Sequence, residues 1–169
     1  MICANKLGAF GVLLADCLER AWGELSSSAA ALLLTLYYSP KATATELAKV
    51  ARISQPTAAR VLDGLVRQGL IERKGRTGRI TALLVTRAGG RRARALEAAR
   101  LRAMNDVLSG LRPPERASFE RVLNTILASA TTSRAQARSI CRLCDHASCR
   151  GAVCPVGTRA SEIERTAQS

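Results

Sequence analysis

The sequence predicts a mainly α-helical protein with one small β-hairpin. Only 3% of the 169 residues are aromatic although 47% are hydrophobic, so a core must consist mostly of Leu, Ala, Val and Ile, which favours helices over a β-sandwich. Apolar residues recur at three- and four-residue steps along most of the chain. One stretch, residues 70–86, has two β-prone segments around a turn rich in glycine and arginine.

Two apolar helices are expected in the first 38 residues. The apolar positions of residues 2–22 follow helical spacing and are Leu7, Phe10, Leu14, Cys17, Leu18 and Trp22. Cys3 and Cys17 are expected on this helix as small buried hydrophobes. Serines 26–28 offer N-caps for a second helix over residues 29–38, whose almost wholly apolar sequence predicts burial.

Two further helices joined by a tight turn are predicted between residues 45 and 67. Residues 45–53 have apolar side chains at helical spacing and form the first helix of the pair. Ser54 is a preferred N-cap for the second helix, and Pro56 is tolerated in its first turn because first-turn amides have no partner inside the helix. The side chains expected to face the core from this second helix are Ala58, Val61, Leu62 and Leu65.

The other side of the second helix carries side chains that can read DNA. Gln55, Thr57 and Arg60 project from its first turns, opposite the apolar face. Arginine can pair with guanine through two hydrogen bonds, glutamine can do so with adenine, and threonine can bond a base or touch a thymine methyl group. A helix that buries its back and presents these groups near its N-terminus suits the major groove.

A hairpin is predicted after this helix ends at Gly69. Residues 70–74 and 80–86 can form its strands, and residues 75–79, with the sequence Gly-Arg-Thr-Gly-Arg, supply the turn. Its tip is basic, so the hairpin can act as a wing beside the second helix. The residues predicted to bind DNA are therefore Ser54, Gln55, Thr57, Arg60, Arg73, Lys74, Arg76 and Arg79.

Together these segments form a winged helix-turn-helix pattern that resembles the multiple-antibiotic-resistance-regulator (MarR) family. The matching segments are Glu46-Leu47-Ala48, Ser54-Gln55-Pro56-Thr57-Ala58-Ala59-Arg60, Leu65-Val66-Arg67-Gln68-Gly69-Leu70-Ile71-Glu72-Arg73 and Val85-Thr86-Arg87-Ala88-Gly89. The resemblance spans roughly residues 5 to 130 and implies a dimeric bacterial transcription regulator, usually a repressor, on a pseudo-palindromic operator. Wings of this family usually carry an aspartate before the arginine that enters the minor groove. Residues 75–79 include no acidic residue, so Arg79 or Arg76 would take that role without this brace.

Two long helices are expected after the hairpin. The apolar positions of the first are Ala93, Leu96, Leu101, Met104, Val107 and Leu108, and Gly110 closes it. Pro113, Pro114 and Glu115 open the second, with an acidic first turn that the helix dipole favours. Its apolar stripe is Phe119, Val122, Leu123, Ile126 and Leu127. With residues 2–22, these helices match the dimerisation layer that the resemblance implies, and a core within one subunit is the alternative.

The chain divides into five parts on this interpretation. They are N-terminal helices for dimerisation and core at 1–38, the winged helix-turn-helix unit at 39–88, long dimerisation helices at 89–138, a cysteine-rich metal-binding segment at 139–157 and a flexible tail at 158–169. The tail is expected to be flexible because its sequence is polar.

The net charge of +13 is concentrated around the predicted DNA-binding unit. Residues 52–102 contain thirteen basic side chains and three acidic ones. This excess favours neutralisation of DNA phosphates over a merely solvated surface. No run of 18 apolar residues predicts a membrane span, and residues 7–15 lack the flanks of a signal sequence. We therefore expect a cytoplasmic protein with no membrane partner.

Four of the six cysteines lie within fourteen residues, and they are Cys141, Cys144, Cys149 and Cys154. In a cytoplasmic protein, thiols this close favour a metal centre over structural disulfides. One compact run that ends in Cys154-Pro155 favours an iron–sulfur cluster, since zinc sites usually join two separate Cys-x-x-Cys pairs. Zinc, a thiol–disulfide switch and no function are the alternatives. His146 can replace a cysteine on zinc, or it can be an exposed residue that binds nothing.

These observations favour a DNA-binding transcription regulator, not an enzyme. Its expected partners are double-stranded DNA, a second copy of the chain and a small-molecule or redox effector. A change at the cysteines, or in a pocket between the DNA-binding lobes and the dimerisation layer, would alter the spacing of the two DNA-reading helices and release DNA. One alternative is an enzyme of thiol or metal chemistry around Cys144, His146 and Cys149, although no acid–base pair or oxyanion device accompanies them. The other is a protein-interaction module that keeps the fold without binding DNA.

Overall fold

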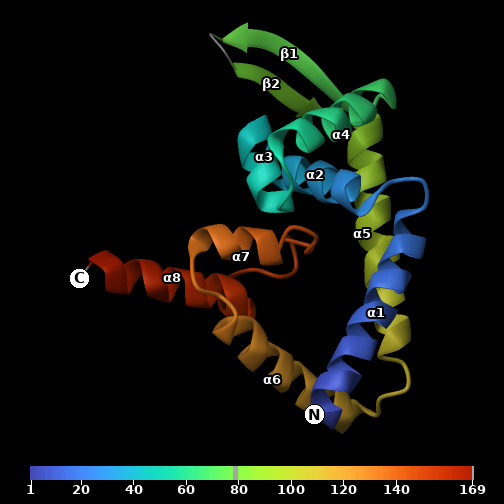
Figure 1. Ribbon diagram of the computed structural model, residues 1–169, viewed down its shortest axis with the longest axis vertical. Helices are drawn as coiled ribbons and strands as arrows, with labels where there is room; N and C mark the ends of the chain where they lie inside the picture. The colour runs from blue at the N-terminus through green and yellow to red at the C-terminus, as the bar shows by residue number, and fades with distance from the viewer. Residues whose placement is uncertain (78–79, 169) are drawn as a thin grey trace.

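Helices and one antiparallel hairpin make up the structure, which is a computed structural model. It describes residues 1–77 and 80–168, without the side chains of residues 76, 77, 80 and 81. In chain order, the elements of this described part are α1 (Ile2–Trp22), α2 (Ser27–Tyr38), α3 (Ala44–Ala51), α4 (Gln55–Arg67), β1 (Ile71–Thr77), β2 (Ile80–Val85), α5 (Arg87–Val107), α6 (Pro113–Ser129), α7 (Arg134–Ile140), the 3₁₀ turn η1 (Gly151–Val153) and α8 (Pro155–Gln168) (Figure 1). The predicted fold class is confirmed.

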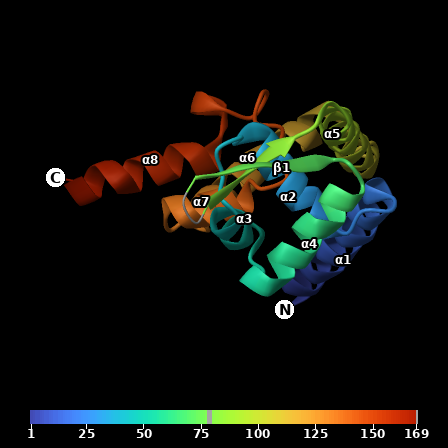
Figure 2. The same ribbon diagram turned by 90° about the horizontal axis from the view of Figure 1, so that it is seen from above.

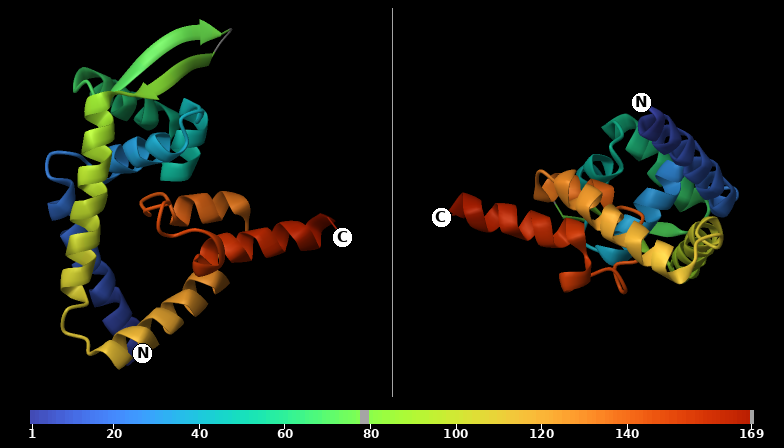
Figure 3. Two further views of the ribbon diagram at one scale, coloured as in Figure 1. Left: turned by 180° about the vertical axis from the view of Figure 1, so that it is seen from behind. Right: turned by 90° about the horizontal axis from the view of Figure 1, so that it is seen from below.

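The long axis of the molecule consists of α1 and α5, which lie side by side and run in opposite directions (Figures 1 and 3). Because α5 covers only one side of α1, Leu7 and Val12 are 61% and 63% exposed. Cys3 is also exposed and Cys17 is half-buried, so the prediction that both cysteines are buried is wrong for the single chain. No helix among the described residues has the length and apolarity that crossing a membrane requires.

The helix-turn-helix lobe, which comprises α2, α3, α4 and the hairpin, is built around α2. Ser26 caps this helix by accepting a hydrogen bond from the amide of Ala29, and the apolar sequence that follows is buried. Both α3 and α4 pack on α2. The same core includes Trp22 from α1 and Leu96 from α5, so the lobe is anchored to one end of the long axis.

The hairpin pairs β1 with β2, with Ile71 opposite Val85. The structure extends β1 to Thr77, so residues 75–77, predicted as turn, belong to the strand. The register shifts between Lys74 and Arg76, where Gly75 has a φ of 54°. This is a β-bulge, and its left-handed backbone favours glycine. The glycine that suggested a turn therefore marks a bulge.

Helices α6 and α7 lead the chain back toward the lobe, and α8 then runs outward to the C-terminal end (Figure 1). Helix α6 leaves the far end of the long axis, and α7 then lies beside α3 (Figures 1 and 3). The flexible tail predicted at 158–169 is instead the helix α8, which extends to Gln168. Its order has a physical cause, because Ala160 is fully buried beside Ala137 of α7, and Glu164 pairs with Arg134 of α7 at 2.6 Å.

Candidate nucleic-acid interface and cysteine cluster

Helix α4 presents three polar side chains on an exposed surface. The Oγ of Ser54 accepts a hydrogen bond from the amide of Thr57 at 3.2 Å and lies 2.8 Å from the Thr57 hydroxyl, so Ser54 caps the helix. Gln55, Thr57 and Arg60 are exposed. The opposite face is buried through Ala58, Leu62 and Leu65. The sequence predicted this division of the helix.

The start of α4 is fixed by α3 and a tight turn. Thr43 and Glu46 form a capping box, in which the Thr43 hydroxyl accepts from the Glu46 amide at 3.2 Å and the Glu46 carboxylate accepts from the Thr43 amide at 2.8 Å. The hydrogen bonds from Thr43 lower the pKa of the Glu46 carboxyl. Arg52 then adopts a left-handed conformation, with a φ of 56°, that turns the chain toward Ser54. The capping box at the start of α3 and the left-handed residue at its end therefore fix where α4 begins relative to α3.

The hairpin and α4 lie on the same face of the molecule (Figure 2). An ion pair joins them, since the guanidinium of Arg73 donates to the carboxylate of Asp63 at 2.6 Å. Arg73 thereby holds β1 against α4, a positioning role that the sequence did not reveal. Lys74 is exposed, with its Nζ 3.6 Å from the carboxylate of Glu72.

Two predicted wing contacts cannot be placed. The side chain of Arg76 and the whole of Arg79 lie outside the described residues. The part of the predicted DNA surface that the structure brings together therefore consists of the first turns of α4 and the base of the wing, with the side chains of Ser54, Gln55, Thr57, Arg60, Arg73 and Lys74.

The four clustered cysteines gather in the connection between α7 and α8. Cys154 is buried in a small apolar cluster with Ala137, Val156 and Ala160, and Cys141 and Cys149 pack against it. Leu143, between the first two cysteines, packs instead against the main core of the lobe. The cysteine segment, residues 141–154, therefore bridges two apolar clusters. A cavity of about 190 Å³ opens beside Cys141, His146, Cys149 and Cys154.

All six cysteines, each in the described part of the chain, are free. The four clustered thiols form two hydrogen-bonded pairs, Cys141 with Cys144 and Cys149 with Cys154. The hydrogen bond from Cys141 lowers the pKa of Cys144 to about 6, and it raises the pKa of Cys141 together with burial. Burial raises the pKa of Cys149 to about 11. The lowered pKa favours the thiolate form of Cys144, which is the form that binds metals.

Positively charged and hydrogen-bond-donating groups lie near these thiols, together with the carboxylate of Asp145. Arg100 of α5 interacts electrostatically with Cys144 and Cys149, and its Nε is buried with no hydrogen-bond partner in the described structure. At the N-terminus of α8, the amide of Gly157 donates to the sulfur of Cys154 at 3.2 Å. Positive charge and helix N-termini stabilise thiolates, so the environment suits an anionic thiolate–metal centre.

The side chains are not yet arranged as a finished metal site. Among residues 1–77 and 80–168, no three Cys, His, Asp or Glu side chains stand close enough together to hold a metal ion as they are. The sequence left His146 either as a zinc ligand or as a residue that binds nothing. In the structure, Nε2 of His146 lies 3.0 Å from the carbonyl oxygen of Cys141, and its ring lies 5.0 Å from the ring of Tyr38. The four thiols are the side chains that would hold an iron–sulfur cluster or zinc at this place.

Three residues that sequence reasoning missed connect the cysteine segment to the lobe. The hydroxyl of Tyr38, at the end of α2, lies 2.6 Å from the Glu97 carboxylate of α5 and 3.2 Å from the Asp145 carboxylate of the cysteine segment. Asp145 also accepts hydrogen bonds from the amides of Ala147 and Ser148, and so orders the loop between Cys144 and Cys149. The only sequence signal was the position of Asp145 beside a cysteine.

Comparison with known proteins identifies relatives of the lobe and its long helices. The model of the MarR family matches residues 25–78. The solved structure of the transcriptional regulator PA3341 is 30% identical, with a TM-score of 0.57, over 75% of this chain and 96% of that one. No curated protein sequence matches the chain.

Two solved structures of the MarR family protein Rv2887 of Mycobacterium tuberculosis are also similar. Its complex with salicylic acid is 27% identical, with a TM-score of 0.58, over 71% of this chain and 92% of that chain. Its complex with DNA is 24% identical, with a TM-score of 0.63, over 73% of this chain and 95% of that chain. These matches include nearly all of the relative and leave about a quarter of this chain uncovered.

Proposed function

Because the chain belongs to the MarR family of transcription regulators, we propose that it binds a pseudo-palindromic operator as a homodimer and represses transcription there. We further propose that Cys141, Cys144, Cys149 and Cys154 hold an iron–sulfur cluster, or otherwise zinc, whose state adjusts the affinity for DNA. The single observation that carries the DNA-binding proposal is the exposed row of Gln55, Thr57 and Arg60 on the capped first turns of α4.

The chemistry of this row supports base reading. An amide, a hydroxyl and a guanidinium stand on the solvent side of a helix whose other side is fixed in the core. Arg60 can reach two acceptors on guanine, and a contact of this kind discriminates against a wrong base by about 1–3 kcal/mol. The hairpin stands on the same face (Figure 2), and the exposed ammonium group of Lys74 in β1 can meet a phosphate. The complex of Rv2887 with DNA supports the same assignment.

A homodimer is supported by apolar side chains that the single chain leaves exposed. Val122 and Ile126 of α6 are 54% and 48% exposed, and α1 exposes Leu7 and Val12. A two-fold pairing would bury these faces and present two copies of α4 to half-sites about one helical turn of DNA apart. The same pairing explains why α6 has no residue buried by its own chain in the described structure.

The test of DNA binding is selection of an operator from random duplexes, followed by titration of Arg60→Ala on the selected sequence. We expect affinity to fall about tenfold or more, within the range of a lost bidentate contact. The control is Arg159→Ala, which removes the same charge from α8. Failure to enrich any sequence, or equal binding by Arg60→Ala and the unchanged protein, would refute the proposal.

The metal proposal rests on the donor set and its charge. The four cysteine sulfurs would be the ligands. An iron–sulfur cluster would supply a redox-active anionic centre, whereas zinc would supply a purely structural one. Arg100 offsets the negative charge of the thiolates, and the Gly157 amide orients the sulfur of Cys154. Closure of four thiolates around one centre would also order the cysteine segment.

Metal analysis and a visible absorption spectrum of protein purified without oxygen test this part. We expect iron and sulfide with a broad visible absorption, or zinc without one, and loss of either in Cys144→Ser. Operator affinity should differ between metal-loaded protein and protein treated with a chelator. If oxygen exposure and chelation both leave operator affinity unchanged, the cysteines are not the sensor. A small-molecule effector, supported by the complex of Rv2887 with salicylic acid, would then be the candidate.

A further inference from the structure

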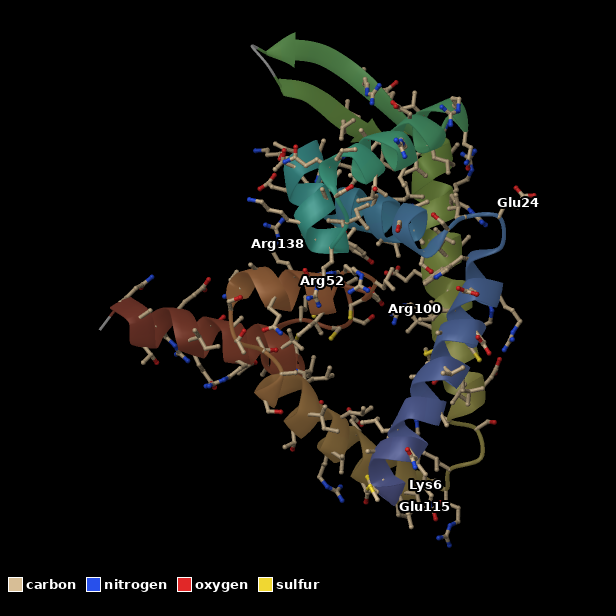
Figure 4. The ribbon with its side chains drawn as sticks, viewed as in Figure 1. Lys6, Glu24, Arg52, Arg100, Glu115 and Arg138 are labelled. Atoms are coloured by element: carbon tan, nitrogen blue, oxygen red, sulfur yellow. The ribbon has the colours of Figure 1, made fainter. Side chains whose placement is uncertain are left out.

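Helix α7, which leads directly into the cysteine segment, touches the helix-turn-helix. The hydroxyl of Ser139 donates to the carbonyl oxygen of Lys49 in α3 at 3.4 Å. Arg138 interacts electrostatically with Glu46 of the capping box. A groove of about 410 Å³ runs between the two helices, and Arg52 and Arg138 both line it (Figure 4). Since α3 packs against α4, the position of α7 bears on the DNA-reading helix.

The docking of α7 does not cover the DNA-reading face. In Figure 1, α7 lies on the side of α3 opposite the hairpin, and Figure 2 shows α4 and the hairpin together on the other face. Helix α7 therefore contacts the side of α3 that faces away from the proposed DNA surface, so it does not block DNA binding. A contact of this kind lowers the conformational entropy that the lobe loses when it binds an operator.

A second connection runs through Tyr38. Its hydroxyl has one proton and faces two carboxylates, those of Glu97 at 2.6 Å and Asp145 at 3.2 Å. The hydroxyl can donate to only one of them at a time. Asp145 is held in place by the loop amides of Ala147 and Ser148, so this contact depends on the order of the loop between Cys144 and Cys149.

From these contacts we propose that the cysteine segment is a metal-dependent latch, which holds α7 on α3 when its four cysteines are bound and releases it when they are not. The inference rests on the metal site of the proposed function and adds the contacts through which metal binding changes the affinity for DNA. Metal fixes the loop around Asp145, the loop engages Tyr38 at the end of α2, and α7 supports α3. Metal loss frees the loop, α7 leaves α3, and operator affinity falls.

The test compares Tyr38→Phe with Tyr37→Phe in the full-length protein. Tyr38→Phe keeps the ring and removes only the hydroxyl, which meets both Glu97 and Asp145. Tyr37→Phe is a matched control, because its hydroxyl is adjacent in sequence but accepts from Arg94 at 3.3 Å. Metal content, operator affinity and hydrogen exchange of α3 and α7 are measured for protein purified without oxygen and for the same protein after chelation.

We expect metal to tighten operator binding about fivefold or more in the unchanged protein and in Tyr37→Phe, a typical size for coupling between sites. In Tyr38→Phe, metal content should be unchanged, while the gain falls to about twofold or less because the loop no longer engages α2. Chelation should speed exchange in α7 and α3 of the unchanged protein and leave α1 unaffected. The chelated forms of all three proteins should bind the operator alike.

The outcomes separate the latch from the proposed function. If the unchanged protein binds metal and responds to it, but Tyr38→Phe keeps the full response and exchange in α3 is insensitive to metal, the latch is wrong and the regulator stands. If Tyr38→Phe weakens operator binding equally with and without metal, the residue serves only the packing of the lobe, and the latch is again wrong. Unchanged protein that carries no metal would overturn the metal site and the latch together.

Discussion

At the scale of single residues, Gly89 shows how tightly the wing and α5 are joined. It lies in the first turn of α5, which Thr86 caps by accepting a hydrogen bond from the Gly89 amide at 3.0 Å. A Cβ at this position would stand 1.9 Å from the carbonyl oxygen of Leu70, a backbone atom that cannot move aside without disturbing β1. At Gly90, the nearest atoms to such a Cβ are side-chain atoms of Arg94 and Tyr37 at 3.8 Å.

We therefore predict opposite effects of alanine at these adjacent glycines. Gly89→Ala should destabilise the protein by about 2–4 kcal/mol, since the backbone between the lobe and the long axis must shift. Gly90→Ala should be neutral or stabilising by up to about 1 kcal/mol, because alanine favours a helix over glycine. Urea unfolding followed by circular dichroism measures both. Equal stability of the two variants would contradict the close approach of α5 to Leu70.

At the scale of elements, α7 and α8 form a small unit with its own apolar cluster. Ala137, Cys154, Val156 and Ala160 are its buried members, and Arg134 and Glu164 close it at the surface with two hydrogen bonds of 3.0 and 2.6 Å. Both side chains of this ion pair are almost half exposed, so the pair contributes little beyond orientation. The apolar contacts therefore hold the unit, and with it three of the four clustered thiols.

A charged side chain in the apolar cluster between α7 and α8 should unfold these two helices and leave the helix-turn-helix lobe folded. Ala160→Asp places a carboxylate where the native side chain is fully buried, and an unpaired buried charge costs several kcal/mol. We expect rapid proteolysis within residues 134–168, loss of bound metal and an unchanged melting transition of the lobe. Ser161→Asp, with the same charge at the exposed neighbour, should behave as the unchanged protein. Intact metal binding in Ala160→Asp would show that the cysteines do not depend on α8.

At the scale of the whole molecule, the exposed apolar faces of α1 and α6 are the feature a single chain does not explain. Phe10 and Phe119 join these helices edge-on, with 6.0 Å between their ring centroids. Beyond this contact, Val122 and Ile126 face solvent in the single chain. On the proposed function, a second copy covers them, and operator binding depends on that pairing.

A lysine on this face should separate the subunits. Val122→Lys would bury an ammonium group in the proposed interface, and we expect a monomer by light scattering with a fall in operator affinity of about tenfold or more, because only one half-site can be held at a time. Asn124→Lys adds the same charge to another face of α6 and should remain dimeric. A dimeric Val122→Lys protein with full operator affinity would move the interface elsewhere.

The sequence by itself determined the helix-turn-helix, because each of its signals acts over a few residues. Ser54 caps the helix that follows it, and Ala58, Leu62 and Leu65 repeat at the spacing of one helix face. The same local reasoning failed at α8, where small residues such as Ala160 gave too weak an apolar signal against a polar background. It failed at Gly75 because a glycine serves a bulge and a turn equally well.

Only the tertiary structure decided which side chains of different elements contact one another. Asp63 of α4 meets Arg73 of β1, and Arg100 of α5 faces thiols more than forty residues away. Tyr38 meets Glu97 and Asp145, which lie 59 and 107 residues along the chain. Polar side chains have no periodicity that foretells a distant partner, because their pairing depends on how the apolar faces of whole helices pack. The contact of the cysteine segment with the helix-turn-helix therefore exists only in the folded chain.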